Sequence, residues 1–181
     1  MSVDPATLSI VSFPDKILLT RARPVPAITD EVRRVAERML DLMDEAEGIG
    51  LAAPQVGLSW RLFVLDVPGG EGRSTETDPP SATASPMVFV NPRILSFEGP
   101  VEPFEEGCLS LPEIRGDVLR PPIVTVEATD LEGRTFQLRA GGLLSRCVQH
   151  EYDHLDGVLI LDRMTQKSRL KTRSAVRDLQ S

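Results

Sequence analysis

Several kinds of residue are scarce in this chain of 181 residues. It has one Trp, one Tyr and six Phe, too few for the aromatic platforms on which many proteins stack single-stranded nucleic acid. No apolar run approaches the ~18 residues that a membrane-spanning helix needs, and residues 1–30 lack the basic-then-apolar order of a secretory signal. We therefore expect a cytoplasmic protein with neither a DNA partner nor a membrane partner.

Cysteine is also scarce, with two residues in the chain. One disulfide could form in principle, but a chain without an export signal more often keeps its thiols reduced. We expect each cysteine to serve as a thiolate metal ligand or as a small buried side chain.

Basic residues are few until the C-terminal end of the chain. Residues 1–162 carry 14 basic and 26 acidic groups, whereas residues 163–181 carry six basic and one acidic. The length fits one catalytic domain over residues 1–164, followed by a basic tail over 165–181 that we expect to be helical. The simpler interpretation of the tail is a solvated helix face, and the alternative is a contact with ribosomal RNA through residues 163–181.

The chain has two histidines, His150 and His154, and Glu151 directly follows the first. On a helix, residues four apart lie on one face, so both imidazoles could bind the same metal ion while Glu151 stands beside it. A histidine on an apolar helix face is more often a packed core residue. Because the chain uses its whole supply of histidine on this one spacing, a metal site is the better interpretation.

A catalytic tetrahedral site normally has three protein ligands and one open position, so a third ligand is required. No third histidine exists and no glutamate follows the motif. Asp162 could serve, but it falls in what we expect to be a short strand. Cys147 lies too far back along the helix and is expected to be a pocket residue. Cys108, in an extended segment after Gly107, is the best remaining soft ligand.

Hydrophobic periodicity predicts a small set of regular elements. We expect a polar surface loop over residues 68–86, which contains no large apolar residue, and a turn at Glu132 and Gly133. The predicted elements are a helix at 30–47 with Thr29 as N-cap, strands at 61–67, 87–91, 123–131 and 134–140, and a helix at 141–155.

Three segments occur in the chain in the order GIGLAAPQVG (48–57), EGCLSLP (106–112) and QHEYDHLDG (149–157). Together they resemble the signature motifs of the peptide deformylase family, and residues 8–25 resemble that family's opening. The resemblance implies an α+β fold in which mixed and antiparallel β-sheets surround a central helix carrying H-E-x-x-H. It implies one Fe²⁺ per chain, replaceable by Zn²⁺, Ni²⁺ or Co²⁺, and removal of the N-formyl group from the formylmethionine of nascent bacterial polypeptides.

The resemblance also implies roles for individual residues. Cys108, His150 and His154 would bind the metal. Glu151 would act as general base and acid while metal-bound water attacks the formyl carbon and formate is released. Gln55 and the backbone N–H of Leu109 would donate to the developing oxyanion, although Gln55 could instead be a loop-capping amide.

The substrate backbone would pair along Ile49 and Gly50 on one side and Gly107 on the other. The methionine side chain would enter an apolar pocket near Leu143 and Cys147. Gly50 could instead be an ordinary turn glycine. Arg146 replaces an apolar residue found in many members of the family, so we expect the pocket rim to differ there.

Two alternatives remain at this point. One is an H-E-x-x-H metallopeptidase that uses Asp162 as its third ligand. The other is a noncatalytic ribosome-associated module with a structural metal. Whichever of these functions the chain performs, we expect it to be a monomer.

Overall fold

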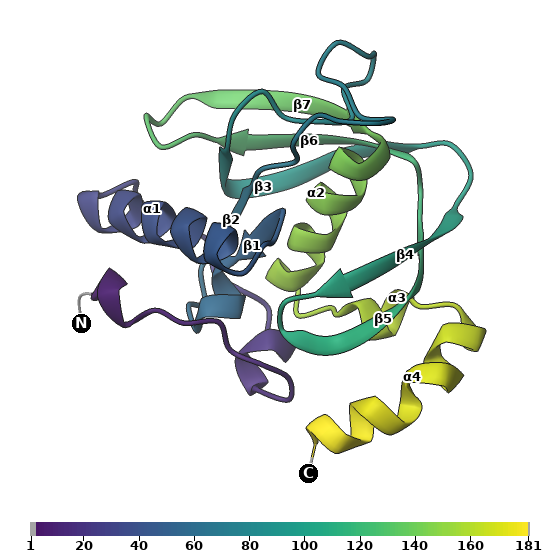
Figure 1. Cartoon of the computed structure of the whole chain (residues 1–181). Helices are drawn as coiled ribbons and strands as arrows, with labels where there is room; N and C mark the ends of the chain where they lie inside the picture. Colours follow the sequence, from purple (N-terminus) through teal and green to yellow (C-terminus); the bar gives the residue numbers. More distant parts are fainter. Residues whose placement is uncertain (1–2, 181) are drawn as a thin grey trace.

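Residues 3–180 are described by the computed structural model, which shows helix α2 held between two antiparallel sheets (Figure 1). The larger sheet has the strand order β1-β2-β3-β6-β7, and β4 and β5 form the smaller one. The expected α+β architecture around a central helix is therefore confirmed. The strands are β1 Gly50–Ala52, β2 Leu62–Leu65, β3 Met87–Glu98, β4 Glu102–Cys108, β5 Leu111–Arg120, β6 Ile123–Thr129 and β7 Thr135–Gly141.

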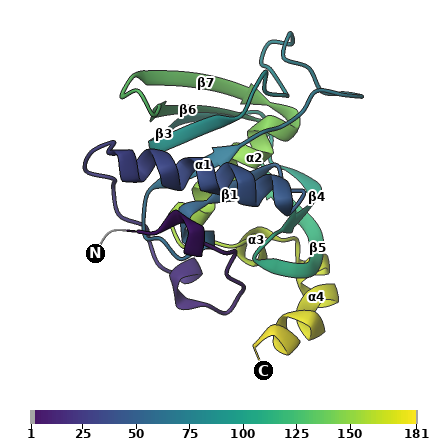
Figure 2. The ribbon, with the colours of Figure 1, turned by 60° about the vertical axis from the view of Figure 1, so that its left-hand side comes forward.

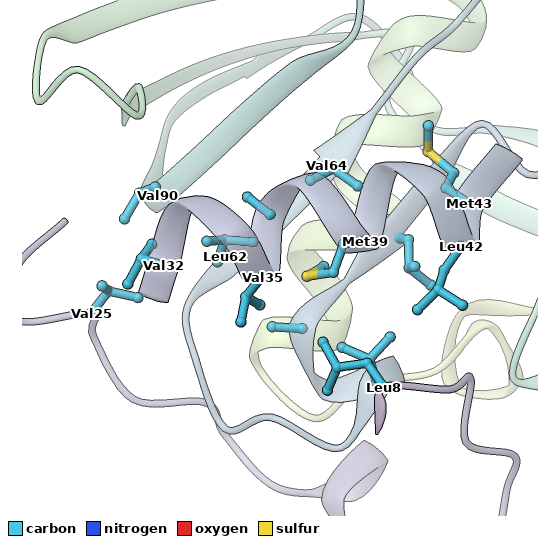
Figure 3. Packing of buried hydrophobic residues seen from close by; sticks show 14 residues of the cluster. Leu8, Val25, Val32, Val35, Met39, Leu42, Met43, Leu62, Val64 and Val90 are labelled. Atoms are coloured by element: carbon cyan, nitrogen blue, oxygen red, sulfur yellow. The ribbon is translucent and has the colours of Figure 1, made fainter. Parts of the chain in front are cut away.

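Helix α1 (Asp30–Glu45) begins at the predicted cap, where the Thr29 hydroxyl accepts a hydrogen bond from the backbone N–H of Val32. Its apolar face packs on β1 and β2, and Met39 at the centre of that face is fully buried (Figure 3). The helix ends two residues earlier than predicted, because Glu47 adopts a positive φ of 53° before the chain enters β1.

Helix α2 (Gly142–Leu155) is buried on most of its surface, with ten of its fourteen residues inaccessible. Leu144, Val148 and Leu155 pack against the larger sheet, where Phe63 and Phe89 stack. Gly157 ends the helix at a φ of 73°, and a Cβ there would lie 2.8 Å from the carbonyl carbon of Leu19. The histidine motif therefore lies on a helix that neighbouring segments cover on most of its surface.

Two further predicted elements differ from the structure. Strand β3 continues to Glu98 rather than ending at residue 91, because it pairs with β6 from Val90 to Glu98. Residues 160–163 form a short helix, α3 (Ile160–Arg163), instead of a strand. The Asp162 carboxylate accepts from the backbone N–H of Leu159 and so stabilises the start of that helix.

The segment 68–86 contains no helix or named strand, as its composition predicts. It is nevertheless attached at its far end, because the Thr83 hydroxyl accepts from the N–H of Val67 and donates to the carboxylate of Asp66. Short 3-10 turns complete the chain at η1 Pro5–Thr7, η2 Lys16–Leu19 and η3 Ala53–Val56.

The basic C-terminal segment forms helix α4 (Gln166–Leu179), which lies beside β5 in both ribbon views (Figures 1 and 2). Ser168 and Thr172 are buried on its inner face, and the Ser168 hydroxyl accepts from the N–H of Asp117 in β5. Residues 1–2 belong to the domain expected over 1–164, and residue 181 belongs to the tail expected over 165–181. These three residues lie outside those that the structure describes. Across residues 3–180, no helix is long and apolar enough to cross a membrane.

Candidate metal centre and cleft

Helix α2 and the end of β4 bring together the three residues expected to hold a metal. The ligand atoms of Cys108, His150 and His154 all lie within 4.8 Å of one another, and the Cys108 sulfur is 3.3 Å from Nε2 of His154. Cysteine sulfur and imidazole nitrogen are both donors that bind zinc and similar divalent ions. The donors present therefore fit a divalent metal.

Two further residues lie next to this cluster: Glu106 contacts His150, and Arg120 contacts Glu106. Glu106 Oε2 lies 3.2 Å from Nδ1 of His150, so that the other ring nitrogen is left for the metal. Arg120 donates to both Glu106 oxygens, at 2.8 and 3.1 Å. Burial raises the pKa of Glu106, but the hydrogen bonds from His150 and Arg120 prevail and lower it to about 2. Glu106 is thus a carboxylate that orients His150, a role that we did not predict from sequence.

Glu151 lies beside the metal group but is not part of it. Burial raises the pKa of this carboxyl to about 7. Its Oε2 is buried and has no hydrogen-bond partner among the described residues. A Cβ on Gly50 would overlap its Oε1, so the missing side chain makes room for Glu151. Gly50 is therefore more than an ordinary turn glycine.

The sequence allowed two roles for Gln55, a loop-capping amide or a donor that faces the metal cluster, and the two ends of its side-chain amide divide these roles between them. Its side-chain oxygen accepts from the N–H of Ala52 at 2.8 Å, which caps the short helix η3. Its amide nitrogen lies 3.3 Å from the Ser110 hydroxyl and 3.6 Å from the Cys108 sulfur. Because the oxygen is fixed by the backbone, the N–H₂ group points toward the metal cluster.

A cavity of about 620 Å³ opens in front of the cluster. Across residues 3–180, β1 pairs only with β2 and β4 only with β5, so each presents an unpaired edge. Unpaired strand edges are the usual place where an extended peptide adds as another strand. The cavity is lined by every residue expected to contact the substrate, namely Ile49, Gly50, Gly107, Leu143, Arg146 and Cys147, and also by Leu109 in the β4–β5 turn.

Cys147 and Arg146 occupy the inner wall of the cavity. The Cys147 thiol donates to the carbonyl oxygen of Ile49 at 3.3 Å, and burial raises its pKa well above the ordinary thiol value. Arg146 is buried rather than exposed at the rim. It donates to the backbone carbonyls of Glu102 and Val118 and lies over the ring of Phe104. Arg146 therefore stabilises the wall of the cavity that β4 and β5 form.

The fold and the site together indicate a metal-dependent hydrolase with a possible metal site formed by one cysteine and two histidines. Residues 7–170 match the family model described as polypeptide deformylase, and the chain belongs to that family. It is a hydrolase that removes the N-terminal formyl group from formylmethionine.

Individual relatives are similar over nearly the whole chain. A peptide deformylase 2 from Gloeobacter violaceus is 43% identical over 178 residues, covering 96% of this chain and 90% of that protein. A peptide deformylase from Acinetobacter baumannii is 44% identical over 171 residues, covering 94% and 90%. The crystal structure of a peptide deformylase from Synechococcus elongatus in complex with actinonin matches with a TM-score of 0.82 and 41% identity, covering 97% and 89%.

These findings do not favour the two alternatives. A metallopeptidase would need Asp162 as a ligand, but that carboxylate caps α3 and is not in the metal-binding group. A noncatalytic module is at odds with the enzyme family to which the chain belongs.

Proposed function

We propose that this chain performs deformylation with Cys108, His150 and His154 as metal ligands and Glu151 as the group that moves the proton. The bound ion is proposed to be Fe²⁺, with Zn²⁺, Ni²⁺ or Co²⁺ able to replace it. When bound, a divalent ion supplies a Lewis acid that lowers the pKa of water and polarises a carbonyl oxygen.

Glu151 supports this role by its position and its pKa. An acid with a pKa of about 7 can both accept and return a proton near neutral pH. We propose that its carboxylate takes the proton of the attacking water and delivers it to the departing methionine amine. The unpartnered Oε2 is the oxygen available for that transfer.

Gln55 and the N–H of Leu109 are proposed to stabilise the negative charge on the formyl oxygen. The fixed amide of Gln55 requires no rearrangement when that charge develops, which is what makes such donors effective. One donor of this kind typically contributes about 3–4 kcal/mol to lowering the barrier.

The substrate backbone is proposed to bind as an added strand between β1, at Ile49 and Gly50, and β4, at Gly107. The methionine side chain would then enter the pocket at Leu143 and Cys147. Backbone hydrogen bonds are indifferent to side-chain identity, so this mode accepts many nascent chains while the formyl group and methionine provide selectivity.

The observation that carries the proposal is the cluster of one sulfur and two imidazoles beside a carboxyl with a raised pKa. The test measures formate release from formyl-Met-Ala-Ser by anaerobically prepared, iron-loaded protein. Glu151→Ala should lose activity and keep its metal, whereas Cys108→Ser should lose metal. Full activity in Glu151→Ala, or full metal content in Cys108→Ser, would refute the assignment. Metal analysis of anaerobically purified protein tests the choice of iron.

We propose further that the basic segment 163–181 contacts the ribosome, and that the chain acts in the cytoplasm as a monomer. Helix α4 leaves Lys167, Lys171 and Arg173 exposed while its other face packs on β5. A polyanion attracts such a face, and salt weakens the attraction. Because α4 is attached to the domain over 1–164, charge reversal at Lys171 and Arg173 tests this better than deletion. Ribosome co-sedimentation that is unchanged by the reversal removes the proposal.

A further inference from the structure

Four charged side chains connect the proposed metal ligand His150 to the protein surface through a continuous series of contacts. From the inside outward the series runs from His150 through Glu106, Arg120 and Asp153 to Arg163. Arg120 donates to Glu106 through Nε and Nη2 and to Asp153 Oδ2 through Nη1, at 2.7 Å. Arg163 donates to both oxygens of Asp153, at 2.7 and 2.8 Å. We name this series the ion-pair chain.

The ion-pair chain joins four elements that are separate in the sequence. His150 and Asp153 lie on α2, and the remaining members lie on β4, β5 and α3. Glu106, Arg120 and Asp153 are buried, whereas the Arg163 side chain is 47% exposed. The outer end of the ion-pair chain borders a second cavity of about 310 Å³, which is lined in part by Arg120, Asp153 and Arg163. Arg163 is therefore the point where the ion-pair chain reaches solvent.

Arg163 influences the orientation of Arg120 because both arginines donate to the carboxylate of Asp153. Asp153 Oδ2 accepts from both Arg120 and Arg163. Without Arg163, the buried charge of Asp153 would have Arg120 as its remaining close cation, and Arg120 would be drawn away from Glu106. Glu106 would then keep Arg146, whose Nη1 lies 3.2 Å from Oε1, but would lose its two-point contact with Arg120, and it would hold Nδ1 of His150 less firmly.

We propose that Arg163 is a positioning residue for the metal centre, acting through Asp153, Arg120 and Glu106 on the ring of His150. Groups that orient a metal-bound histidine typically change metal affinity by about 10–100-fold when they are removed. That range applies to Glu106, which contacts the ring directly. For Arg163, which is separated from the ring by three intervening residues, we expect a smaller effect, about 3–10-fold.

The experiment compares zinc-loaded protein with the variants Arg163→Gln, Arg163→Lys and Arg21→Gln. Arg21 also pairs with an acidic residue near the end of α2, Asp156, but it is 78% exposed and contacts no member of the ion-pair chain. The rate at which a chelator removes zinc is measured, together with the rise in melting temperature that zinc loading produces. Ligand that binds the folded state raises this temperature according to its affinity.

We expect Arg163→Gln to release zinc about 3–10-fold faster and to show a smaller zinc-induced rise in melting temperature. Arg163→Lys keeps the charge but loses the paired geometry, so its release rate should be intermediate. Arg21→Gln should match the unmodified protein. In the same preparations, kcat for formyl-Met-Ala-Ser should fall in Arg163→Gln with KM unchanged.

Zinc release that is equal in all variants would overturn the proposal, even if Arg163→Gln melts at a lower temperature with and without zinc. If Arg163→Gln does not fold, a release rate of Arg163→Lys equal to that of Arg21→Gln overturns it. The inference rests on the metal centre proposed above. Failure of the unmodified chain to bind zinc would refute that centre and this inference together, whereas equal binding by all variants refutes only the role of Arg163.

Discussion

Gly50→Ala should impair catalysis without disturbing the metal. An added Cβ would overlap Oε1 of Glu151, and it would lie 2.9 Å from Cδ of Glu151 and 2.8 Å from the sulfur of Cys147. Ordinary contacts begin at 3.4 Å, so the Glu151 carboxylate must retreat by about half an ångström or more. A displacement of ~1 Å in a reacting group costs about 100-fold in rate, and we therefore expect kcat to fall by about 10–100-fold.

The assay measures formate release from formyl-Met-Ala-Ser and metal content in the same preparations. Overpacking of this kind should also lower the free energy of unfolding by about 1–3 kcal/mol. Gly69→Ala is the matched control, because a Cβ there meets its nearest neighbour only at 3.9 Å. A Gly50→Ala protein with its full kcat would refute the placement of Glu151 against this glycine.

Three further outcomes are expected. Met39→Ala, at the fully buried centre of the α1 face, should lower the free energy of unfolding in urea by about 2–5 kcal/mol, and a loss below 1 kcal/mol would contradict the packing. Because the folded-state pKa of Glu106 lies below 4.5, at about 2, its stabilisation is present above pH 4.5 and is lost as the pH falls toward 2. Urea titrations of metal-free protein across this range should show that loss, and Glu106→Gln should lack it. Iodoacetamide at pH 8 should leave Cys147 unlabelled in the folded protein and label it after denaturation, as peptide mass spectrometry would show, since burial raises its pKa.

The clustering of Cys108, His150 and His154 was predictable because its signal is local and chemical. The spacing of His150 and His154 fixes both rings on one helix face whatever surrounds them. The scarcity of soft donors then left Cys108 as the best third ligand. Sequence alone could state that Gln55 is either a loop-capping amide or an oxyanion donor. That one side chain can do both depends on the turn, which fixes the amide oxygen and directs the amide nitrogen toward the cluster.

The supporting residues could not be found in this way. Glu106 begins the EGCLSLP segment, so its proximity to Cys108 was evident, but its contacts with Arg120 and His150 depend on the β4–β5 register and on the position of α2. The residue type of Arg146 indicated that the pocket rim would differ, whereas the direction of its side chain was set by the free carbonyls of the two strands. Residues 160–163 form too short an apolar run to distinguish a strand from a helix, and the capping carboxylate of Asp162 decided between them.

X-ray absorption of the zinc-loaded protein tests the metal centre most directly, because it counts the donor atoms around the ion. We predict one sulfur at about 2.3 Å and two imidazole nitrogens at about 2.0–2.1 Å. A spectrum with nitrogen and oxygen donors alone in the unmodified protein would contradict the account.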